Sequence, residues 1–216
     1  MKYKAALFDM DGTILDTLED MHSSVNAALR HFFLPEIGLD DTRAFVGNGA
    51  ARLIERAVPP GTSPALTAEV LEWYKRYYND HSSISTAPYA GIPELLAALK
   101  AAGVSLAVVS NKPDQTVREL ADAFFGGLFV SAVGESPAVR RKPCPDTVNA
   151  AVAAMGLEKS ECVYIGDSEV DVATAKNAGL DCISVSWGFR SEAQLAESGA
   201  ALIVRTPAEL GKVLLD

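Results

Sequence analysis

The chain has 216 residues, of which 49% are hydrophobic and 22% charged, and it carries a formal net charge of −9 at pH 7. This composition is typical of a soluble globular protein with room for a core and a small second domain, and the acidic balance argues against nucleic acid or an anionic membrane as a partner. We expect a cytoplasmic protein, because no apolar run reaches membrane-span length, no signal peptide is visible, and the three cysteines are spaced as reduced thiols are.

The first predicted element is a buried strand over residues 5–8, which is followed by two carboxylates, Asp9 and Asp11. Because side chains alternate along a strand, these carboxylates begin on the same face, and Gly12 then allows a sharp turn. A polar turn after a strand is one interpretation of this segment. The other is a reactive or metal-binding site, since charges beside a buried strand need a cation or a chemical role to offset their desolvation.

Residues 16–85 are predicted to form an all-helical domain inserted into the chain. An apolar stripe over residues 18–32 has the helical period, with Asp16 or Thr17 as the N-cap. Ser63, followed by a proline, marks the start of another helix. A second domain of helices is therefore expected between the first strand and the rest of the chain.

A glycine-containing loop with Gly47 and Asn48 lies within this helical segment and leads to Arg52. The structural interpretation is a tight joint between two helices, because glycine accepts backbone angles that other residues avoid. The functional interpretation is a loop that contacts the substrate, with Arg52 either clamping a carboxylate or facing solvent. Gly47, Asn48 and Arg52 are thus candidate substrate-binding residues.

From residue 86 onward, strand and helix patterns alternate. Strands are predicted at residues 104–109, 129–133, 162–165 and 181–185 and near Leu202, and helices at 93–102, 113–124, 145–155 and 170–178 and from Pro207. This alternation predicts an α/β fold with a parallel sheet and crossover helices, built from residues 1–15 and 86–216. Because ligands bind outside the carboxyl ends of such strands, Asp9, Ser110 and Asp167 are expected to converge there.

Four short segments resemble the motifs of the haloacid dehalogenase-like hydrolases, in that family's order. They are residues 9–13 (DMDGT), Ser110 with Asn111, Lys142 with Pro143, and residues 166–171 (GDSEVD). More narrowly, the chain resembles the phosphoglycolate phosphatase-like group, whose glycine-containing cap loop and Trp-Gly-Phe tail have counterparts at residues 46–49 and 187–189. The resemblance implies a doubly wound, Rossmann-like core with an inserted helical cap.

The resemblance also implies a phosphatase that hydrolyses a small phosphomonoester, most specifically phosphoglycolate, through an aspartyl-phosphate. Asp9 is the expected nucleophile, Asp11 the general acid and base, and Lys142 the cation that neutralises the phosphate. Ser110, Asn111 and Thr13 are expected to bind the substrate. Lys112, next to the second motif, receives no role.

The cofactor that the resemblance implies is Mg²⁺, which prefers oxygen ligands in phosphoryl chemistry. Its expected ligands are Asp9, the carbonyl of Asp11, and Asp167. Asp171 lies one helical turn after Asp167, so it is expected either to ligate the ion directly or to hold a metal-bound water.

Relatives with this kind of fold leave alternatives open. β-Phosphoglucomutases have Val or Ile where Thr13 stands, and a cap histidine that aligns with Met21 rather than His22, which disfavours a phosphomutase. A pyrophosphatase keeps the same motifs. A signalling receiver domain has no place for a helical insertion, and a non-catalytic phospho-ligand binding protein does not need four intact motifs. The sequence sets neither the individual phosphomonoester nor the oligomeric state.

Overall fold

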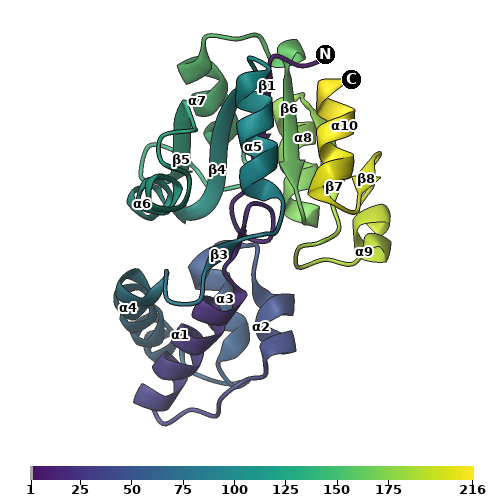
Figure 1. Cartoon of the computed structure of the whole chain (residues 1–216). Coiled ribbons are helices and arrows are strands. Elements are labelled where there is room, and N and C mark those ends of the chain that lie inside the picture. The colour runs from purple at the N-terminus through teal and green to yellow at the C-terminus, as the bar shows by residue number, and fades with distance from the viewer. Residues whose placement is uncertain (1) are drawn as a thin grey trace. The chain divides into compact units, whose positions relative to one another are not determined.

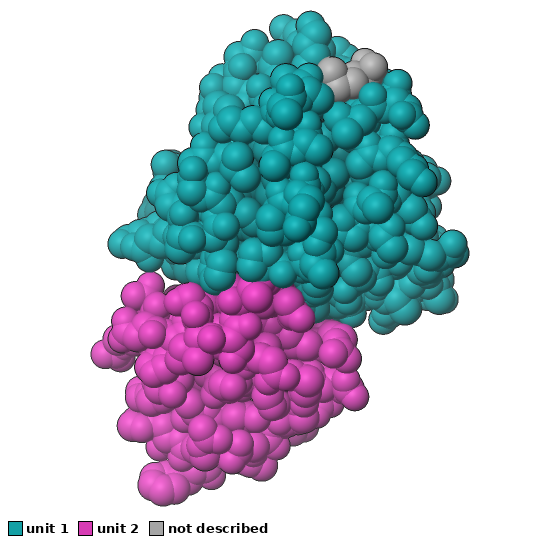
Figure 2. Space-filling model, in the orientation of Figure 1, with its two compact units in different colours: residues 1–15, 88–216 teal, residues 16–87 magenta. Residues whose placement is uncertain are grey.

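The computed structural model describes residues 2–216 and contains two compact units (Figure 2). One unit comprises the residues up to Leu15 together with Pro88–Asp216, and the other comprises Asp16–Ala87. The chain passes between the units twice, and the segments where it does so, β2 (Leu15–Asp16) and β3 (Ala87–Pro88), pair as a two-stranded sheet. The chain therefore enters and leaves the smaller unit through neighbouring segments.

The larger unit is built on a six-stranded sheet with the order β5-β4-β1-β6-β7-β8, in which all paired strands are parallel (Figure 1). Its strands are β1 (Ala5–Phe8), β4 (Ser105–Pro113), β5 (Ser131–Glu135), β6 (Cys162–Gly166), β7 (Asp181–Val185) and β8 (Ile203–Val204). The order runs outward from β1 in both directions. The predicted doubly wound α/β fold is thereby confirmed.

Helices cover both faces of this sheet. On one face lie α5 (Ile92–Ala101), α6 (Asp114–Phe125) and α10 (Pro207–Leu215), and on the other lie α7 (Asp146–Met155) and α8 (Glu169–Ala178). A short 3-10 turn, η1 (Lys159–Glu161), precedes β6, and α9 (Glu192–Glu197) follows β7. In β1, Phe8 packs into the core on the face with α5, α6 and α10, and Leu7 packs into the core on the face with α7 and α8. Because both faces of the strand are buried, its sequence is a continuous apolar run.

One strand extends past its predicted end, and another begins after its predicted start. β4 reaches Pro113, because its pairing with β5 shifts register after Val109 and resumes where Pro113 meets Glu135. β5 begins at Ser131 rather than Phe129, since the Phe129 ring packs edge-to-face on Phe125 of α6, with ring centroids 5.5 Å apart. As a result, the second motif lies within the end of β4 instead of after it.

The smaller unit is helical, with α1 (Leu18–His31), α2 (Leu39–Phe45), α3 (Gly49–Ala57) and α4 (Pro64–His81). The Ser63 hydroxyl accepts a hydrogen bond from the Leu66 N–H at 3.2 Å, so the predicted cap is confirmed. The buried Asp20 carboxylate accepts hydrogen bonds from the backbone N–H groups of Ser85 and Thr86, which tie the end of this unit to its first helix. Within residues 2–216, no helix has both the length and the apolar character that a bilayer crossing needs.

Candidate active site

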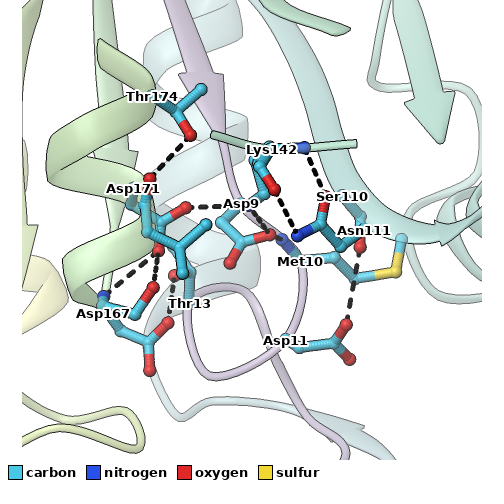
Figure 3. Close-up of polar contacts among 12 residues, drawn as sticks. Asp9, Met10, Asp11, Thr13, Ser110, Asn111, Lys142, Asp167, Asp171 and Thr174 are labelled. Carbon is cyan, nitrogen blue, oxygen red and sulfur yellow. Dashed lines mark hydrogen bonds and ion pairs between the residues drawn. The ribbon is translucent and has the colours of Figure 1, made fainter. Parts of the chain in front are cut away.

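Three neighbouring strands bring the motif residues to one edge of the sheet (Figure 3). Asp9 follows β1, Ser110 lies near the end of β4, and Asp167 follows β6. The backbone of Asp9 still belongs to the sheet, since its N–H donates to the carbonyl of Ile165 at 2.8 Å. Because β1 lies between β4 and β6, Asp9 comes from the middle of the three strands, at the edge where parallel sheets bind ligands.

Asp9, Asp167 and Asp171 form a buried acidic cluster, in which one carboxylate oxygen of each lies within 4.8 Å of the others. Burial first, and the charge of Asp171 second, raise the pKa of Asp9 well above its ordinary value and raise the pKa of Asp167 to about 7. The lysine that contacts this cluster, Lys142, balances only one of its charges. A buried set of carboxylate oxygens with excess negative charge fits a divalent cation such as Mg²⁺.

Lys142 is held by three acceptors, one for each proton of its ammonium group. Its Nζ lies 2.8 Å from Asp9 Oδ1 and 2.7 Å from Asp171 Oδ1, and it donates to the Tyr164 hydroxyl at 3.1 Å. Burial disfavours the charge on Lys142, but Asp171 and Asp9 outweigh burial and raise its pKa above the ordinary value. The side chain is therefore a fixed, fully paired cation beside Asp9.

The backbone of Lys142 is fixed as well, by the side chain of Asn111. The Lys142 N–H donates to Asn111 Oδ1 at 2.6 Å, and Asn111 Nδ2 donates to the Lys142 carbonyl at 3.2 Å. These two bonds join the end of β4 to the loop before α7. The Asn111 side chain thus supports the backbone of Lys142.

The Asp171 carboxylate accepts hydrogen bonds from several donors. Its Oδ2 accepts hydrogen bonds from the Ser168 N–H and hydroxyl, at 3.1 and 2.6 Å, which close the first turn of α8. Its Oδ1 accepts from the Tyr164 hydroxyl at 2.9 Å in addition to Lys142. Tyr164 was not predicted from the sequence, because a tyrosine inside an apolar strand is normally a packing residue.

Two glycines surround the carboxylate of Asp167 at close range. A Cβ on Gly12 would lie 2.3 Å from Asp167 Oδ2, and a Cβ on Gly188 would lie 2.4 Å from the same oxygen and 2.2 Å from the Gly12 carbonyl oxygen. The Phe189 N–H donates to Asp167 Oδ2 at 2.7 Å, and the Thr13 hydroxyl donates to Oδ1 at 3.4 Å. Side chains larger than glycine would push this carboxylate out of place, so the close approach explains both glycines.

Asp11 does not join the acidic cluster. Its Oδ1 lies 2.9 Å from Lys112 Nζ, and the Ser110 hydroxyl donates to its Oδ2 at 3.5 Å. In Figure 3 its carboxylate lies apart from those of Asp9 and Asp167, on the side of Ser110. The pairing with Lys112 was not foreseen from the sequence, although a lysine directly after the second motif was visible there.

The three cap candidates lie in the Asp16–Ala87 unit, at the junction of α2 and α3. Gly47 has a φ of 108°, which suits glycine, and Asn48 is the N-cap residue of α3. Arg52, on α3, pairs with Glu55 through Nη1 and Oε2, and both side chains are more than half exposed. An exposed pair of this kind contributes little to stability, so Arg52 can change partners at small cost.

Comparison with known proteins identifies the family. The model of a family described as haloacid dehalogenase-like hydrolase matches residues 6–185. A phosphoglycolate phosphatase of Caulobacter vibrioides is 35% identical over 216 residues, covering 96% of this chain and 89% of the relative.

Solved structures agree with this similarity. A provisionally named phosphoglycolate phosphatase of Lactobacillus delbrueckii subsp. bulgaricus is 40% identical, with a TM-score of 0.95 over 100% of this chain and 99% of that one. The CbbY protein of Rhodobacter sphaeroides, solved with xylulose-1,5-bisphosphate, is 26% identical with a TM-score of 0.80, over 99% of both chains. The resemblance seen in the four motifs is confirmed, and the chain belongs to the haloacid dehalogenase-like hydrolases.

Proposed function

We propose that this chain is a Mg²⁺-dependent phosphatase of small phosphomonoesters and that 2-phosphoglycolate is its substrate. The observation that carries the proposal is the buried cluster of Asp9, Asp167 and Asp171 with Lys142 in contact with two of its members. An unprotonated carboxylate that attacks a phosphate must overcome the repulsion of two anions, and a fixed cation reduces that repulsion. The choice of 2-phosphoglycolate is supported by the names of the relatives.

In the first step, Asp9 attacks phosphorus, and a bond forms between its carboxylate oxygen and the phosphoryl group. The bond between phosphorus and the ester oxygen breaks, and Asp11 gives a proton to the departing oxygen. Lys142 remains between Asp9 and Asp171 and neutralises the charge that gathers on the phosphoryl oxygens. The Ser110 hydroxyl and the backbone N–H of Asn111 donate to the same oxygens.

In the second step, water attacks phosphorus in the aspartyl-phosphate, and the bond to Asp9 breaks. Asp11, now ionised, accepts the proton of that water, so that the acid of the first step becomes the base of the second. Phosphate leaves, and Asp9 regains its carboxylate. Asp11 must therefore reach the leaving-group side of the phosphoryl group, opposite Asp9, in both steps.

Bound Mg²⁺ would supply positive charge that offsets the anionic phosphate and its attacker. The residues that fit this ion are Asp9, Asp167 and the backbone carbonyl of Asp11. Each oxygen of Asp171 already accepts two hydrogen bonds from protein donors, so we assign Asp171 to holding Lys142 rather than to the ion. Thr13, whose hydroxyl faces Asp167, acts with the metal side of the site rather than on the leaving group.

The Asp16–Ala87 unit is assigned the role of a cap that excludes bulk water during the first step. Gly47, Asn48 and Arg52 are its candidates for contact with the part of the substrate beyond the phosphate. The proposal includes a cytoplasmic location, where a small phosphorylated metabolite would be met and where the free thiols of Cys144, Cys162 and Cys182 would stay reduced.

The proposal is tested by phosphate release from a panel of phosphomonoesters, with Mg²⁺ and with a chelator, compared by kcat/KM. We expect chelator-sensitive release that is highest for 2-phosphoglycolate. The variant Asp9→Asn should lose on the order of 10³-fold or more in kcat, because it lacks the attacking carboxylate.

The remaining outcomes separate the alternatives. Equal rates on all esters would refute phosphoglycolate as the substrate but would retain the phosphatase assignment. A preference for a sugar bisphosphate would group the chain with CbbY instead. Interconversion of glucose phosphates without phosphate release would establish a phosphomutase, and turnover of pyrophosphate alone a pyrophosphatase. Retained turnover in Asp9→Asn would refute the assigned nucleophile.

A further inference from the structure

The two carboxylates of the first motif lie two residues apart in sequence, yet each contacts a different buried lysine. Asp9 contacts Lys142, and Asp11 contacts Lys112, whose side chain is only 7% exposed. Among residues 2–216, these are the two lysines that the structure buries. Burying an ammonium group is unfavourable unless it is paired. The ion pair of Lys112 with Asp11 is therefore part of the buried structure of the site, unlike an ion pair on a solvated surface.

The local geometry shows what Lys112 does to Asp11. Lys112 follows Ser110 on β4, and its N–H donates to the Ser110 hydroxyl at 3.2 Å, so the lysine is part of the phosphoryl-binding end of that strand. Its Nζ holds Asp11 Oδ1 at 2.9 Å while the Ser110 hydroxyl faces Oδ2. Both contacts draw the Asp11 side chain toward β4 and away from Asp167, which follows β6.

Separation of the two carboxylates matters for the chemistry. A carboxylate that joined the metal-binding oxygens would be lost as a proton carrier, because an oxygen bound to a cation is a poor base. The acidic cluster contains Asp9 but not Asp11, although residues two apart on a strand begin on one face. We propose that Lys112 is a positioning residue that keeps Asp11 on the leaving-group side of the phosphoryl group, apart from the metal site.

This inference rests on the proposed function, in which Asp11 is the acid and base. It predicts that the effect of Lys112 depends on the leaving group. An alkoxide leaves poorly without a proton, whereas p-nitrophenolate leaves without one. Loss of Lys112 should therefore slow the first step for alkyl esters and spare it for p-nitrophenyl phosphate.

The experiment compares the wild-type chain with Lys112→Met, Asp11→Asn and the double variant, on 2-phosphoglycolate, ethyl phosphate and p-nitrophenyl phosphate, with Mg²⁺ present. For Lys112→Met, kcat/KM on both alkyl esters should fall on the order of 10²-fold, the effect of misplacing a catalytic group by about 1 Å. On p-nitrophenyl phosphate, kcat/KM should change little while kcat falls and a burst of p-nitrophenol appears, because the second step still needs the base. The double variant should match Asp11→Asn.

The controls address folding and charge. Lys100→Met removes an exposed lysine of the same unit and should leave all three esters unaffected. Lys112→Arg should restore part of the alkyl-ester activity, since it keeps a cation near Asp11. Lys112→Gln, which keeps a polar but uncharged side chain that is one bond shorter, provides the same comparison if Lys112→Met does not fold.

Three results would overturn the inference. An equal loss of kcat/KM on all three esters would mean that Lys112 maintains the shape of the site, and a loss confined to 2-phosphoglycolate would mean that it binds the substrate's carboxylate. Additive losses in the double variant would show that it acts independently of Asp11. If Asp11→Asn itself retained wild-type rates on alkyl esters, the proposed acid would be wrong, and that result distinguishes failure of the proposed function from failure of the Lys112 inference alone.

Discussion

Replacing Asp167 with asparagine should stabilise the metal-free protein while removing its response to Mg²⁺. Burial and the neighbouring Asp171 raise the pKa of Asp167 from 3.8 to about 7, which means that folding opposes its charge. At 1.36 kcal/mol for each pH unit, this difference amounts to about 4 kcal/mol of destabilisation above pH 7. The asparagine oxygen can accept from the Phe189 N–H while its amide nitrogen donates to the Thr13 hydroxyl, so we expect the variant to recover up to about 4 kcal/mol.

The sign of the pH dependence follows from proton binding. Between about pH 4 and pH 7 the folded protein keeps a proton on Asp167, whereas the unfolded chain has released it. Because the folded state binds more protons in that range, the stability of the metal-free wild type falls as pH rises through it. The advantage of Asp167→Asn should therefore be full above about pH 7 and disappear below about pH 4.

The assay is urea unfolding at pH 8 and pH 4, in chelator and in Mg²⁺. The wild type should gain stability from the ion, by about 2.7 kcal/mol at a concentration one hundred times the dissociation constant, and Asp167→Asn should gain far less. Asp181→Asn is the matched control, because Asp181 is exposed and its contact with Lys2 lowers its pKa. A metal-free Asp167→Asn variant less stable than the wild type at pH 8, or one that kept the full Mg²⁺ effect, would refute the reasoning.

Two further substitutions test the support of the site. Gly188→Ala places a Cβ 2.2 Å from the Gly12 carbonyl oxygen, so it should cost about 1–3 kcal/mol in urea unfolding and weaken Mg²⁺ binding about tenfold or more in thermal-shift titrations. Gly199→Ala, where nothing lies within 4 Å of the added Cβ, should leave Mg²⁺ binding unchanged, and equal Mg²⁺ affinities in the two variants would contradict the close-approach argument. Tyr164→Phe removes one of the three acceptors around Lys142 and should cost about 1–3 kcal/mol in urea unfolding, whereas a neutral result would show that the hydroxyl does not support the lysine.

The sheet and the main site residues were predictable because they depend on local patterns and one topological rule. Short apolar runs locate β1 and β6, and the carboxyl ends of neighbouring parallel strands meet, so Asp9 and Asp167 converge whatever the details of packing. The resemblance to the family motifs then suggests the roles proposed for Ser110 and Lys142. The limits of β4 and β5 were less predictable, because they depend on pairing register and on where Phe129 packs.

Tyr164 and Lys112 escaped prediction for a different reason. The hydroxyl of Tyr164 matters only because Lys142 and Asp171, from two distant segments, meet on the same face of β6. Lys112 reads as an ordinary polar residue after a strand until the turn at Gly12 brings Asp11 to it. Both sets of contacts exist only in the tertiary structure, and no periodicity or propensity in a single segment encodes them.

The same argument explains how one short motif can hold two carboxylates with different chemistry. Strand alternation alone would present Asp9 and Asp11 together, where they would share protons and compete for one cation. The backbone prevents this, because the N–H groups of Thr13, Ile14 and Leu15 all donate to the Met10 carbonyl, so that a tight turn begins at Met10, between the two acids. Each acid then contacts its own buried lysine, Lys142 for Asp9 and Lys112 for Asp11. The proposed division of labour between nucleophile and proton carrier thus depends on two cations placed by two different segments, so the motif alone does not determine it.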